Sequence, residues 1–355
     1  MFQRKYLIFL AVLILAAFAW TGGWFWLADK LRSDIANFVA AQHKNGIVLG
    51  WSDMTISGYP IRFDTTFEEP QGQWTNADTR ILWTGANTSI RPFIEGPGIV
   101  SFDAPGQHQF RIQGNGADVL INTDTGTLEG RLAFDKSGQP FGLQGRAAPF
   151  TAGINGVPVI AIAETAFDWE RRTSLSTGSE IHPDSVGETL SVILEQIDLT
   201  KLPIEAGVTD TLGQTIQTLT SRAALRGPLD PASVDAANLT RWRDAGGTLE
   251  VETFNLVWGP LRIAGNGTLT VDQALQPVGA FSARVSGLDK LLDVLEARGQ
   301  IRRQQAALAR IALAVLMRTP ANGGPPEASL PITIQDRLLS IGPIPLTKLE
   351  PIAWK

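Results

Sequence analysis

The sequence predicts a β-dominated α+β fold, in which one N-terminal transmembrane helix precedes an extended, antiparallel and curved sheet that carries several packed helices. Residues 6–27 form an apolar run without a charge, long enough to cross a bilayer as a helix. Short segments of alternating polarity recur along the rest of the chain, and this period of two is typical of strands with one wet face. The 35 glycines and 21 prolines are ordinary for strands joined by many turns and high for a helical protein.

The apolar run at residues 6–27 is predicted to be a membrane anchor. A helix rises about 1.5 Å per residue, so about 20 residues cross a hydrocarbon core of roughly 30 Å. Three tryptophans lie between residues 20 and 26, and such amphipathic rings favour the headgroup layer. The alternative is a signal peptide cleaved after Ala19, because Ala17-Phe18-Ala19 has the small-x-small pattern of a cleavage site. The apolar run continues past that site to Leu27, which favours the uncleaved anchor.

The flanking charges set the expected orientation of the anchor. Arg4 and Lys5 precede it, whereas Lys30, Arg32 and Lys44 follow it, so the counts of positive charge are nearly equal. The short tail before this single span favours a cytoplasmic N-terminus. The sequence therefore predicts a single-pass protein of the inner (cytoplasmic) membrane, with its bulk on the periplasmic side.

Composition excludes several classes of function. The formal net charge is -5, which argues against nucleic acid as a partner because phosphate binding needs a basic face. The chain has no cysteine, so disulfides, thiol nucleophiles and cysteine-based metal sites are excluded. Hydrophobic residues make up 44% of the chain, enough for a packed core.

The order of predicted elements divides the chain into four parts. They are a membrane anchor (1–28), a stalk helix with a first β-rich unit (29–187), a helical connection (188–247) and a second β-rich unit with two helices (248–355). The sequence leaves open whether the two β-rich units form one continuous sheet or separate domains.

The first β-rich unit is expected to begin with a stalk helix over residues 28–45 that ends at Gly46. One side of this helix is apolar and comprises Leu31, Ile35, Phe38 and Val39. A strand over 47–56 and a turn at Gly58-Tyr59-Pro60 follow, and residues 61–68 then alternate between apolar and polar side chains. Further short strands are predicted around residues 74, 81–83, 99–102, 110–112 and 119–121. Their close spacing favours a meander over βαβ units.

The helical connection is predicted from apolar residues at helical spacing. One helix is expected over 190–197, another over 208–219, and a third over 231–244 that ends at Gly246-Gly247. Residues 171–187, which precede them, are predicted to be a polar loop.

The second β-rich unit begins with a change of phase. Leu249 and Val251 share one parity, whereas the apolar residues from Phe254 to Trp258 share the other, which predicts a β-bulge near Thr253. Amphipathic helices are expected over 288–295 and 300–318, followed by a loop over 319–330 and a strand pair over 332–346. The second helix carries Arg302, Arg303, Arg310 and Arg318. These cations either contact anionic lipid or, as is commoner, form a solvated face.

A short motif occurs twice. G-x-L-x-F-D-x3-Q-P-F-G at residues 130–142 reappears as G-x-L-x-V-D-x3-Q-P-V-G at residues 267–279. Asp135 and Asp272 are expected to begin tight turns by accepting hydrogen bonds from nearby backbone N–H groups. The repeat marks either two related β units or two unrelated hairpins that share turn chemistry.

Few residues are candidates for chemistry. The histidines are His43, His108 and His182, each isolated in the sequence, and no nucleophile elbow accompanies them. Asp53 and Asp64 flank a turn and could act as an acid/base pair, although solvated strand-face carboxylates are the commoner outcome. We therefore predict no catalytic, cofactor-binding or metal-ligating residue.

The stretch W51…G58-Y-P-I-R-F-D64 resembles a bacterial family of membrane-anchored envelope proteins that is classed only as a domain of unknown function. The likeness recurs in W-G-P-L…G-x-G at residues 258–267 and in I-G-P-I-P-L at residues 341–346, and it covers nearly the whole chain after the anchor. No functional residues are established for that family, so the resemblance implies none here. A remoter similarity is to AsmA-like envelope proteins, in which an N-terminal anchor precedes long sheets that form an apolar groove for lipid.

These observations together predict a non-enzymatic envelope protein. Its expected partners are the membrane and either lipid or another envelope protein, without nucleic acid and without a cofactor. The leading hypothesis is that it binds or shields lipid or another apolar ligand on a curved sheet. The alternatives are a scaffold that docks other envelope proteins and a hydrolase with an unrecognised site.

Overall fold

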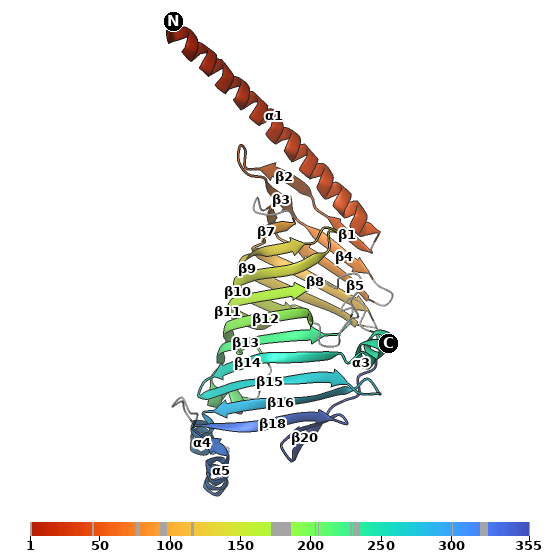
Figure 1. Cartoon of the computed structure of the whole chain (residues 1–355). Helices are drawn as coiled ribbons and strands as arrows, with labels where there is room; N and C mark the ends of the chain where they lie inside the picture. The colour runs from red at the N-terminus through yellow and green to blue at the C-terminus, as the bar shows by residue number, and fades with distance from the viewer. Residues whose placement is uncertain are drawn as a thin grey trace. The chain divides into compact units, whose positions relative to one another are not determined.

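The computed structural model describes the whole chain except residues 1, 45, 76–78, 93–97, 115–116, 172–185, 203, 205, 228, 230–234, 300, 320–325 and 355. The chain divides into two compact units. Unit 1 comprises Met1–Arg131 and Ala152–Pro158, and unit 2 comprises Leu132–Thr151 and Val159–Lys355. A long apolar helix precedes many antiparallel strands and a few short helices (Figure 1), which confirms the β-dominated α+β prediction.

Helix α1 runs without a break from Phe2 to His43, so the predicted anchor and stalk form one helix. It is long and apolar enough to cross a membrane, and the side chains from Phe9 to Ala19 are all exposed. Gly46 follows the helix with a φ of +78°, a left-handed conformation that glycine adopts without steric cost. The predicted end of the stalk is therefore confirmed.

The strands of unit 1 form two branches that meet at one long strand, β9. The strands are β1 (Ile47–Gly50), β2 (Asp53–Ser57), β3 (Asp64–Glu68), β4 (Gln71–Thr75), β5 (Thr79–Gly85), β6 (Thr88–Pro92), β7 (Ile99–Asp103), β8 (Gly106–Gly114) and β9 (Ala117–Phe134). One branch pairs in the order β1, β4, β5, β8 and β9. The other pairs in the order β2, β3, β6, β7 and β9. Strand β9 has 18 residues, which is long enough for both branches.

Unit 2 is an antiparallel meander. Its strands include most of β10 (Pro140–Ile154) and β11 (Val157–Arg171), and then β12 (Val186–Asp198), β13 (Thr215–Arg226), β14 (Thr248–Trp258), β15 (Leu261–Val271), β16 (Pro277–Ser286), β17 (Met317–Arg318), β18 (Glu327–Gln335), β19 (Leu338–Ile341) and β20 (Ile344–Lys348). From β11 to β16 each strand pairs with the next one in the chain. Strand β16 then pairs with β18, β18 with β19, and β19 with β20.

Four helices lie in the connections of unit 2 that the structure describes. They are α2 (Ala206–Leu212), α3 (Ala236–Asp244), α4 (Leu288–Ala297) and α5 (Arg303–Leu316). Helices α3, α4 and α5 confirm three predicted helices. Helix α3 begins at a side-chain cap, where the Asn238 backbone N–H donates to Asp235 Oδ1 over 2.7 Å.

Two of the helices predicted in the segment 188–247 are wrong. Residues 190–197 lie in strand β12, and residues 208–219 divide between the short helix α2 and strand β13. The helical spacing has a specific origin in β12. Gln196 has a φ of +53°, and this irregularity brings Ile197 into the same apolar cluster as Leu194. A strand with an irregularity therefore reproduced the three-residue spacing of a helix.

The C-terminal strand pair predicted over 332–346 is also wrong, because three strands, β18 to β20, occupy this region. Of the loops, most of 171–187 and half of 319–330 lie outside the described residues.

The bulge predicted near Thr253 is confirmed. The register between β14 and β15 shifts between Val251 and Phe254. After the shift, Phe254 pairs with Gly265 and Leu256 with Ile263, so the apolar residues on both sides of the bulge lie on one face of the sheet.

The two copies of the repeat form hairpins with the same local geometry. Asp135 N–H donates to the Gln139 carbonyl and Gln139 N–H donates back to the Asp135 carboxylate, over 2.9 and 3.0 Å. Asp272 and Gln276 exchange the same two bonds, each over 2.8 Å. Both aspartates therefore begin tight turns as predicted.

Candidate functional site

One face of the unit 2 sheet is apolar across strands β12 to β18, and we call it the apolar face. Cross-strand register places on it Leu190, Val192 and Leu194 of β12, Leu219, Ala223 and Leu225 of β13, Leu249, Val251, Phe254 and Leu256 of β14, Ile263 and Leu269 of β15, Phe281, Ala283 and Val285 of β16, and Leu330, Ile332 and Ile334 of β18. Successive side chains of a strand point to opposite faces, so the alternate positions form a second, mixed face. Its polar residues are Thr218, Thr220, Arg222, Asn255, Arg262, Asn266, Thr268, Ser282, Arg284, Ser329 and Thr333, and its apolar residues include Ile193, Ala224, Val257, Ala264 and Ala280.

The apolar face is only partly buried. Ala283 and Val285 are buried, whereas Phe254, Leu256 and Phe281 keep intermediate exposure. The accessible area of the chain is 22482 Å². A globular monomer of this mass exposes about 14,000 Å². Part of this excess belongs to the bare helix α1, and the intermediate exposure of Phe254, Leu256 and Phe281 shows that the apolar face itself is accessible to a ligand.

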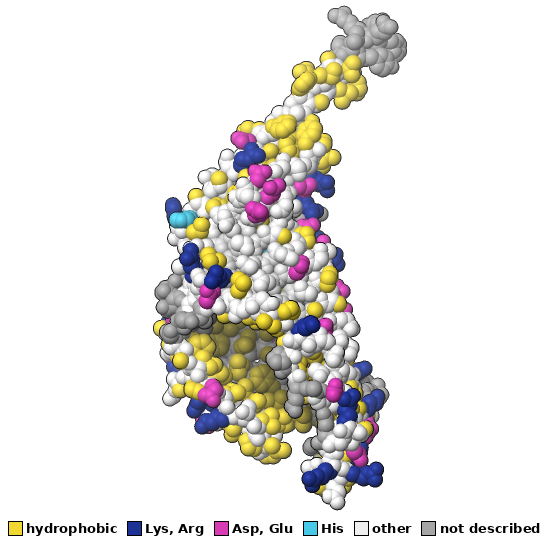
Figure 2. Space-filling view, turned by 180° about the vertical axis from the view of Figure 1, so that it is seen from behind, with side chains coloured by type: hydrophobic (Ala, Val, Ile, Leu, Met, Phe, Trp, Pro, Cys, Tyr) yellow, Lys and Arg dark blue, Asp and Glu magenta, His cyan; other side chains and the backbone are white. Residues whose placement is uncertain are grey.

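Figure 2 shows this accessibility directly. A hollow lined by hydrophobic side chains opens at the level of the unit 2 strands, and charged side chains gather outside it. One end of the apolar face carries the buried cluster of Ile162, Ile197 and Leu199, against which Leu219 and Trp258 pack. Contiguous accessible apolar surface of this kind marks a binding site more often than a structural one.

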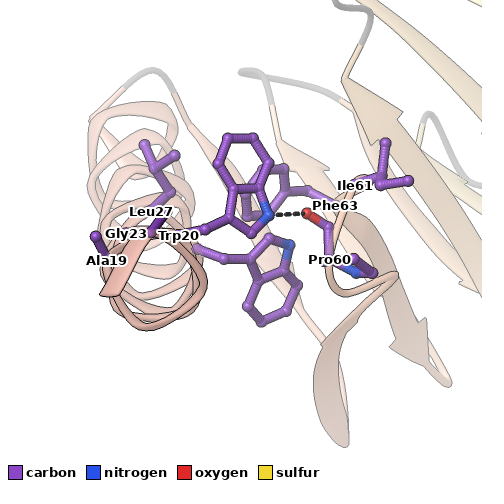
Figure 3. A pocket seen from close by; sticks show the side chains of 9 residues that line it. Ala19, Trp20, Gly23, Leu27, Pro60, Ile61 and Phe63 are labelled. Atoms are coloured by element: carbon purple, nitrogen blue, oxygen red, sulfur yellow. Dashed lines mark hydrogen bonds between the residues drawn. The ribbon is translucent and has the colours of Figure 1, made fainter. Parts of the chain in front are cut away.

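The second candidate lies in unit 1, where the β2–β3 turn (Gly58–Phe63) docks on helix α1. Trp20 Nε1 donates to the Pro60 carbonyl over 2.9 Å (Figure 3). Trp24 Nε1 donates to the Arg62 carbonyl over 3.1 Å, and the hydroxyls of Thr21 and Tyr59 share a hydrogen bond of 2.7 Å. The turn and the helix therefore form one structure at the far end of the apolar run.

A pocket of about 520 Å³ lies beside this junction, and we call it the anchor pocket. Its lining side chains come from α1 and from the β2–β3 turn, and Figure 3 shows Trp20, Leu27, Ile61 and Phe63 around it. Ile61 is 71% exposed. The pocket is thus apolar and borders a hydrophobic side chain that lacks cover.

A cavity of about 290 Å³ lies further along α1, and we call it the unit 1 cavity. The predicted apolar side of the stalk forms one wall, through Leu31, Ile35, Phe38 and Val39. Strands of both branches form the others, for example with Leu49, Phe67, Trp83 and Ile90. No lining residue carries a charge.

The two histidines that the structure describes, His43 and His108, lie in different surroundings. His108 is 6% exposed, its Nε2 lies 2.8 Å from the Ala104 carbonyl, and its ring stacks on Trp83. His43 is exposed at the end of α1, and His182 lies outside the described residues. Among the described residues, no group of three or more His, Asp or Glu side chains is placed to hold a metal ion.

The carboxylate pair considered from the sequence does not converge. Asp53 pairs with Glu68 and Asp64 with Ser57, so the two aspartates lie at opposite ends of the β2–β3 ladder. Asp64 Oδ2 instead lies 3.8 Å from Arg62 Nε, and Asp64 Oδ1 lies 3.6 Å from Arg91 Nε. It is therefore part of a strand-face ion pair.

Arg310, near the middle of the cationic helix α5, forms ion pairs with the neighbouring helix α4. Arg310 lies 2.7 Å from Asp293 and 2.8 Å from Glu296, both on α4. The hydrogen bonds from Asp293 and then Glu296 raise the pKa of Arg310. Arg303 also approaches Glu296, at 3.5 Å. These arginines join two helices, which leaves Arg310 unsuited to binding lipid phosphate.

Sequence reasoning found the wall of the unit 1 cavity on α1 but missed the docking of the β2–β3 turn. The available signal was the aromatic and apolar content of a turn, because Tyr59, Ile61 and Phe63 are unusual in a solvated loop. Their partner, Trp24, is 7% exposed although most of its neighbours on the helix are exposed.

Residues 24–350 match a family described as "Uncharacterized protein conserved in bacteria" (DUF2125). The chain belongs to this family. The match begins at Trp24, the residue that holds the β2–β3 turn, and it includes both units of this DUF2125 protein. No curated protein matches the chain.

Proposed function

We propose that this DUF2125 protein is a non-enzymatic, single-pass protein of the inner membrane, with its body on the periplasmic side, that binds lipid acyl chains on the apolar face of unit 2. The observation that carries the proposal is the continuous, half-exposed apolar face over strands β12 to β18. Apolar surface left in water costs roughly 25 cal/mol per Å². A hydrocarbon ligand removes that cost without needing polar partners.

The placement in the membrane is supported by helix α1. Its side chains from Phe9 to Ala19 are exposed, which suits a lipid environment. The helix passes through Ala19, the cleavage position considered above, and its next residue, Trp20, bonds to the β2–β3 turn. The remote likeness to AsmA-like envelope proteins agrees with an anchored lipid-binding sheet, although fold-level analogy is weak support for function.

A non-enzymatic role is part of the same proposal. Its support is that His108 and Asp64 already have structural partners in Ala104, Arg62 and Arg91. A hydrolase remains the alternative, and lipid turnover by the purified protein would favour it.

The decisive experiment introduces a charge on each face of one strand. Leu256→Glu places a carboxylate on the apolar face, and the matched control Asn255→Glu places it on the mixed face of the same strand. The full-length proteins are purified in mild detergent, and co-purifying lipid is extracted and measured by mass spectrometry. Circular dichroism and the thermal midpoint establish that each variant is folded.

We expect wild type and Asn255→Glu to carry stoichiometric lipid. Leu256→Glu is expected to lose at least about tenfold in bound lipid, because a carboxylate beside hydrocarbon costs well over the 1.4 kcal/mol of a tenfold change in affinity. Wild-type protein without lipid, or equal lipid in both variants, would overturn the proposal.

The membrane placement has its own test. Protein recovered from the membrane fraction is expected to have the intact mass that begins at Met1 and to resist extraction by alkaline carbonate. A mass that begins at Trp20, with the protein in the soluble fraction, would show that the apolar run is a cleaved signal peptide.

One observation favours the second candidate, a scaffold for envelope proteins. In the described residues, strand β20 pairs with β19 on one side, and Ile344 and Leu346 are 62% and 55% exposed. A free strand edge can accept a strand from another protein. Crosslinking that returns a stoichiometric protein partner on residues 344–348, and no lipid, would favour this function.

A further inference from the structure

The two apolar hollows of unit 1 are neighbours along the same side of α1. Leu27 lines the anchor pocket and Leu31 lines the unit 1 cavity. Four residues of helix separate them by about 6 Å. On the facing wall, Phe63 lines the pocket and Thr65 lines the cavity. Two residues of extended chain span roughly 7 Å, so the two hollows lie next to each other on both walls.

A thin layer of side chains separates the hollows. Ala28, 8% exposed, lies on α1 between Leu27 of the pocket and Leu31 of the cavity, and Trp24, 7% exposed, lines the pocket one turn before it. Trp24 stacks on Phe63 across the gap, with ring centroids 5.2 Å apart. Ala28 contributes a single methyl group. We therefore expect that a rotation of the Trp24 or Phe63 ring joins the pocket to the cavity.

The chemistry of the cavity fits a hydrocarbon chain. Its walls are mainly aliphatic and aromatic, with Ile35 and Val39 on one side and Trp83 and Ile90 on another. A charged or sugar-like ligand would leave polar groups unpaired here, which is costly. The volume of about 290 Å³ corresponds to about ten groups of roughly 30 Å³ each, the share of one water molecule. A linear chain with about that many carbons fills it.

The anchor pocket lies at the right depth to receive such a chain. If α1 enters the hydrocarbon at Tyr6, Ala16 lies about 15 Å and Leu27 about 32 Å further along the helix. The pocket that these two residues help to line would then face the outer half of the bilayer and its surface. Ile61 and Tyr59, at 71% and 50% exposed, would lie in the same layer.

We propose that the unit 1 cavity binds one acyl chain of a bilayer lipid, which reaches it from the anchor pocket past Trp24 and Ala28. This inference rests on the proposed function, because α1 presents the pocket to lipid only when the helix spans the membrane. It adds a second, separate site to the apolar face of unit 2 and places that site at the membrane surface.

The test uses the full-length protein in vesicles of phosphatidylethanolamine and phosphatidylglycerol that contain a phosphatidylethanolamine with a diazirine in one acyl chain. After illumination, labelled peptides are mapped by mass spectrometry. We expect label on residues 31–39 and on 83–90. Ile35→Trp fills the cavity and is expected to reduce this label at least about fivefold. Ala28→Trp closes the passage and is expected to do the same.

Ala36→Trp is the matched control, because Ala36 is exposed on the same helix. It is expected to leave the label on the cavity unchanged. Ile35→Trp serves as the second variant should Ala28→Trp fail to fold, since Ile35 borders empty space. Label confined to residues 9–27, or label on the cavity that Ile35→Trp leaves unchanged, would overturn the inference.

The same peptide map separates this inference from the proposed function. Label on unit 2 around Phe254 and Phe281 without label on the unit 1 cavity contradicts this inference and still supports the proposed function. Label on the unit 1 cavity without label on unit 2 supports the inference and removes the apolar face as a lipid site. Absence of label on α1 overturns both, because the helix is then not in the membrane.

Discussion

The indole of Trp24 stacks on the ring of Phe63, with centroids 5.2 Å apart and planes 9° from parallel. The first residue belongs to the N-terminal helix and the second to the β2–β3 turn, 39 positions later. The same indole donates to the Arg62 carbonyl, so one side chain fixes both the ring and the backbone of the turn. Aromatic stacking adds about 0.5–1.5 kcal/mol beyond the area buried.

Replacing this tryptophan should release the turn. Trp24→Ala is expected to lower the free energy of unfolding of unit 1 by about 3 kcal/mol, the usual loss for a buried aromatic side chain. Amide exchange over residues 58–63 should rise in parallel, and both quantities are measured in detergent micelles. Trp26, 65% exposed, provides the control. If Trp26→Ala lowered the free energy of unfolding as much as Trp24→Ala, the stacking of Trp24 on Phe63 would not be its cause.

Strand β15 depends on a glycine that lies under an aromatic ring. A Cβ at Gly267 would lie 2.2 Å from Phe281 Cδ1, on the strand with which β15 pairs. Gly267→Ala must therefore displace Phe281, and it should cost about 1–3 kcal/mol of stability. At Gly142 the nearest atom is 3.5 Å away, so Gly142→Ala should be neutral or slightly stabilising. Urea denaturation measures the free energy of unfolding of the two variants. Equal losses of stability in Gly267→Ala and Gly142→Ala would contradict this prediction.

The C-terminal segment is held by the Gln276 amide side chain and by Trp354 Nε1, which donates to the Leu275 carbonyl over 2.6 Å. Gln276 donates to the Ile352 carbonyl and accepts from the Ile352 N–H, each over 2.9 Å. Gln276→Ala should loosen the segment around Ile352 and cost about 1–3 kcal/mol, the range for two hydrogen bonds lost together. The control is Gln139→Ala, the equivalent position in the other copy of the repeat. Exchange of the Ile352 amide should increase in the first variant and stay slow in the second.

Acid should weaken the turn at Asp135. The Ser137 hydroxyl and then the Gln139 and Ser137 N–H groups hold the pKa of Asp135 below its usual range. The pKa of Asp135 is lower in the folded chain than its unfolded value of about 3.9, so its ionised carboxylate stabilises the fold fully above that pH. This stabilisation is lost as the pH falls through the folded pKa. Asp135→Asn lacks this titration. The difference in stability between wild type and Asp135→Asn should therefore be constant down to about pH 4 and shrink below it, as urea denaturation at several pH values will show.

The helix end, the β-bulge and the tight turns of this chain could be predicted because each depends only on residues that are close in the sequence. The end of α1 at Gly46, the bulge near Thr253 and the turns at Asp135 and Asp272 each follow from a short pattern with one physical cause. The predictions failed where a strand irregularity imitated a helix. Gln196 places Leu194 and Ile197 in one cluster, and no pattern within residues 190–197 separates that arrangement from a helical turn.

The candidate sites could be predicted only in part. The apolar side of the stalk was visible, but its partners, Trp83 and Ile90, come from strands that pair far along the chain. The docking of Pro60 and Phe63 on α1 depends on tertiary contacts across about 40 positions. The apolar face needed the register of every strand pair, which hydrophobic alternation alone does not fix.

The consecutive pairing of β11 to β16 also governs how unit 2 forms. Each strand needs only the strand before it, so loop closure remains short at every step and the entropy lost at each one is small. A chain made from its N-terminus can therefore add strands one at a time, without waiting for distant segments. Until β18 arrives, the growing edge exposes unpaired backbone, which is the stage most open to mispairing with another chain. We therefore expect the β16 edge to be open to mispairing until residues 327–335 have been added.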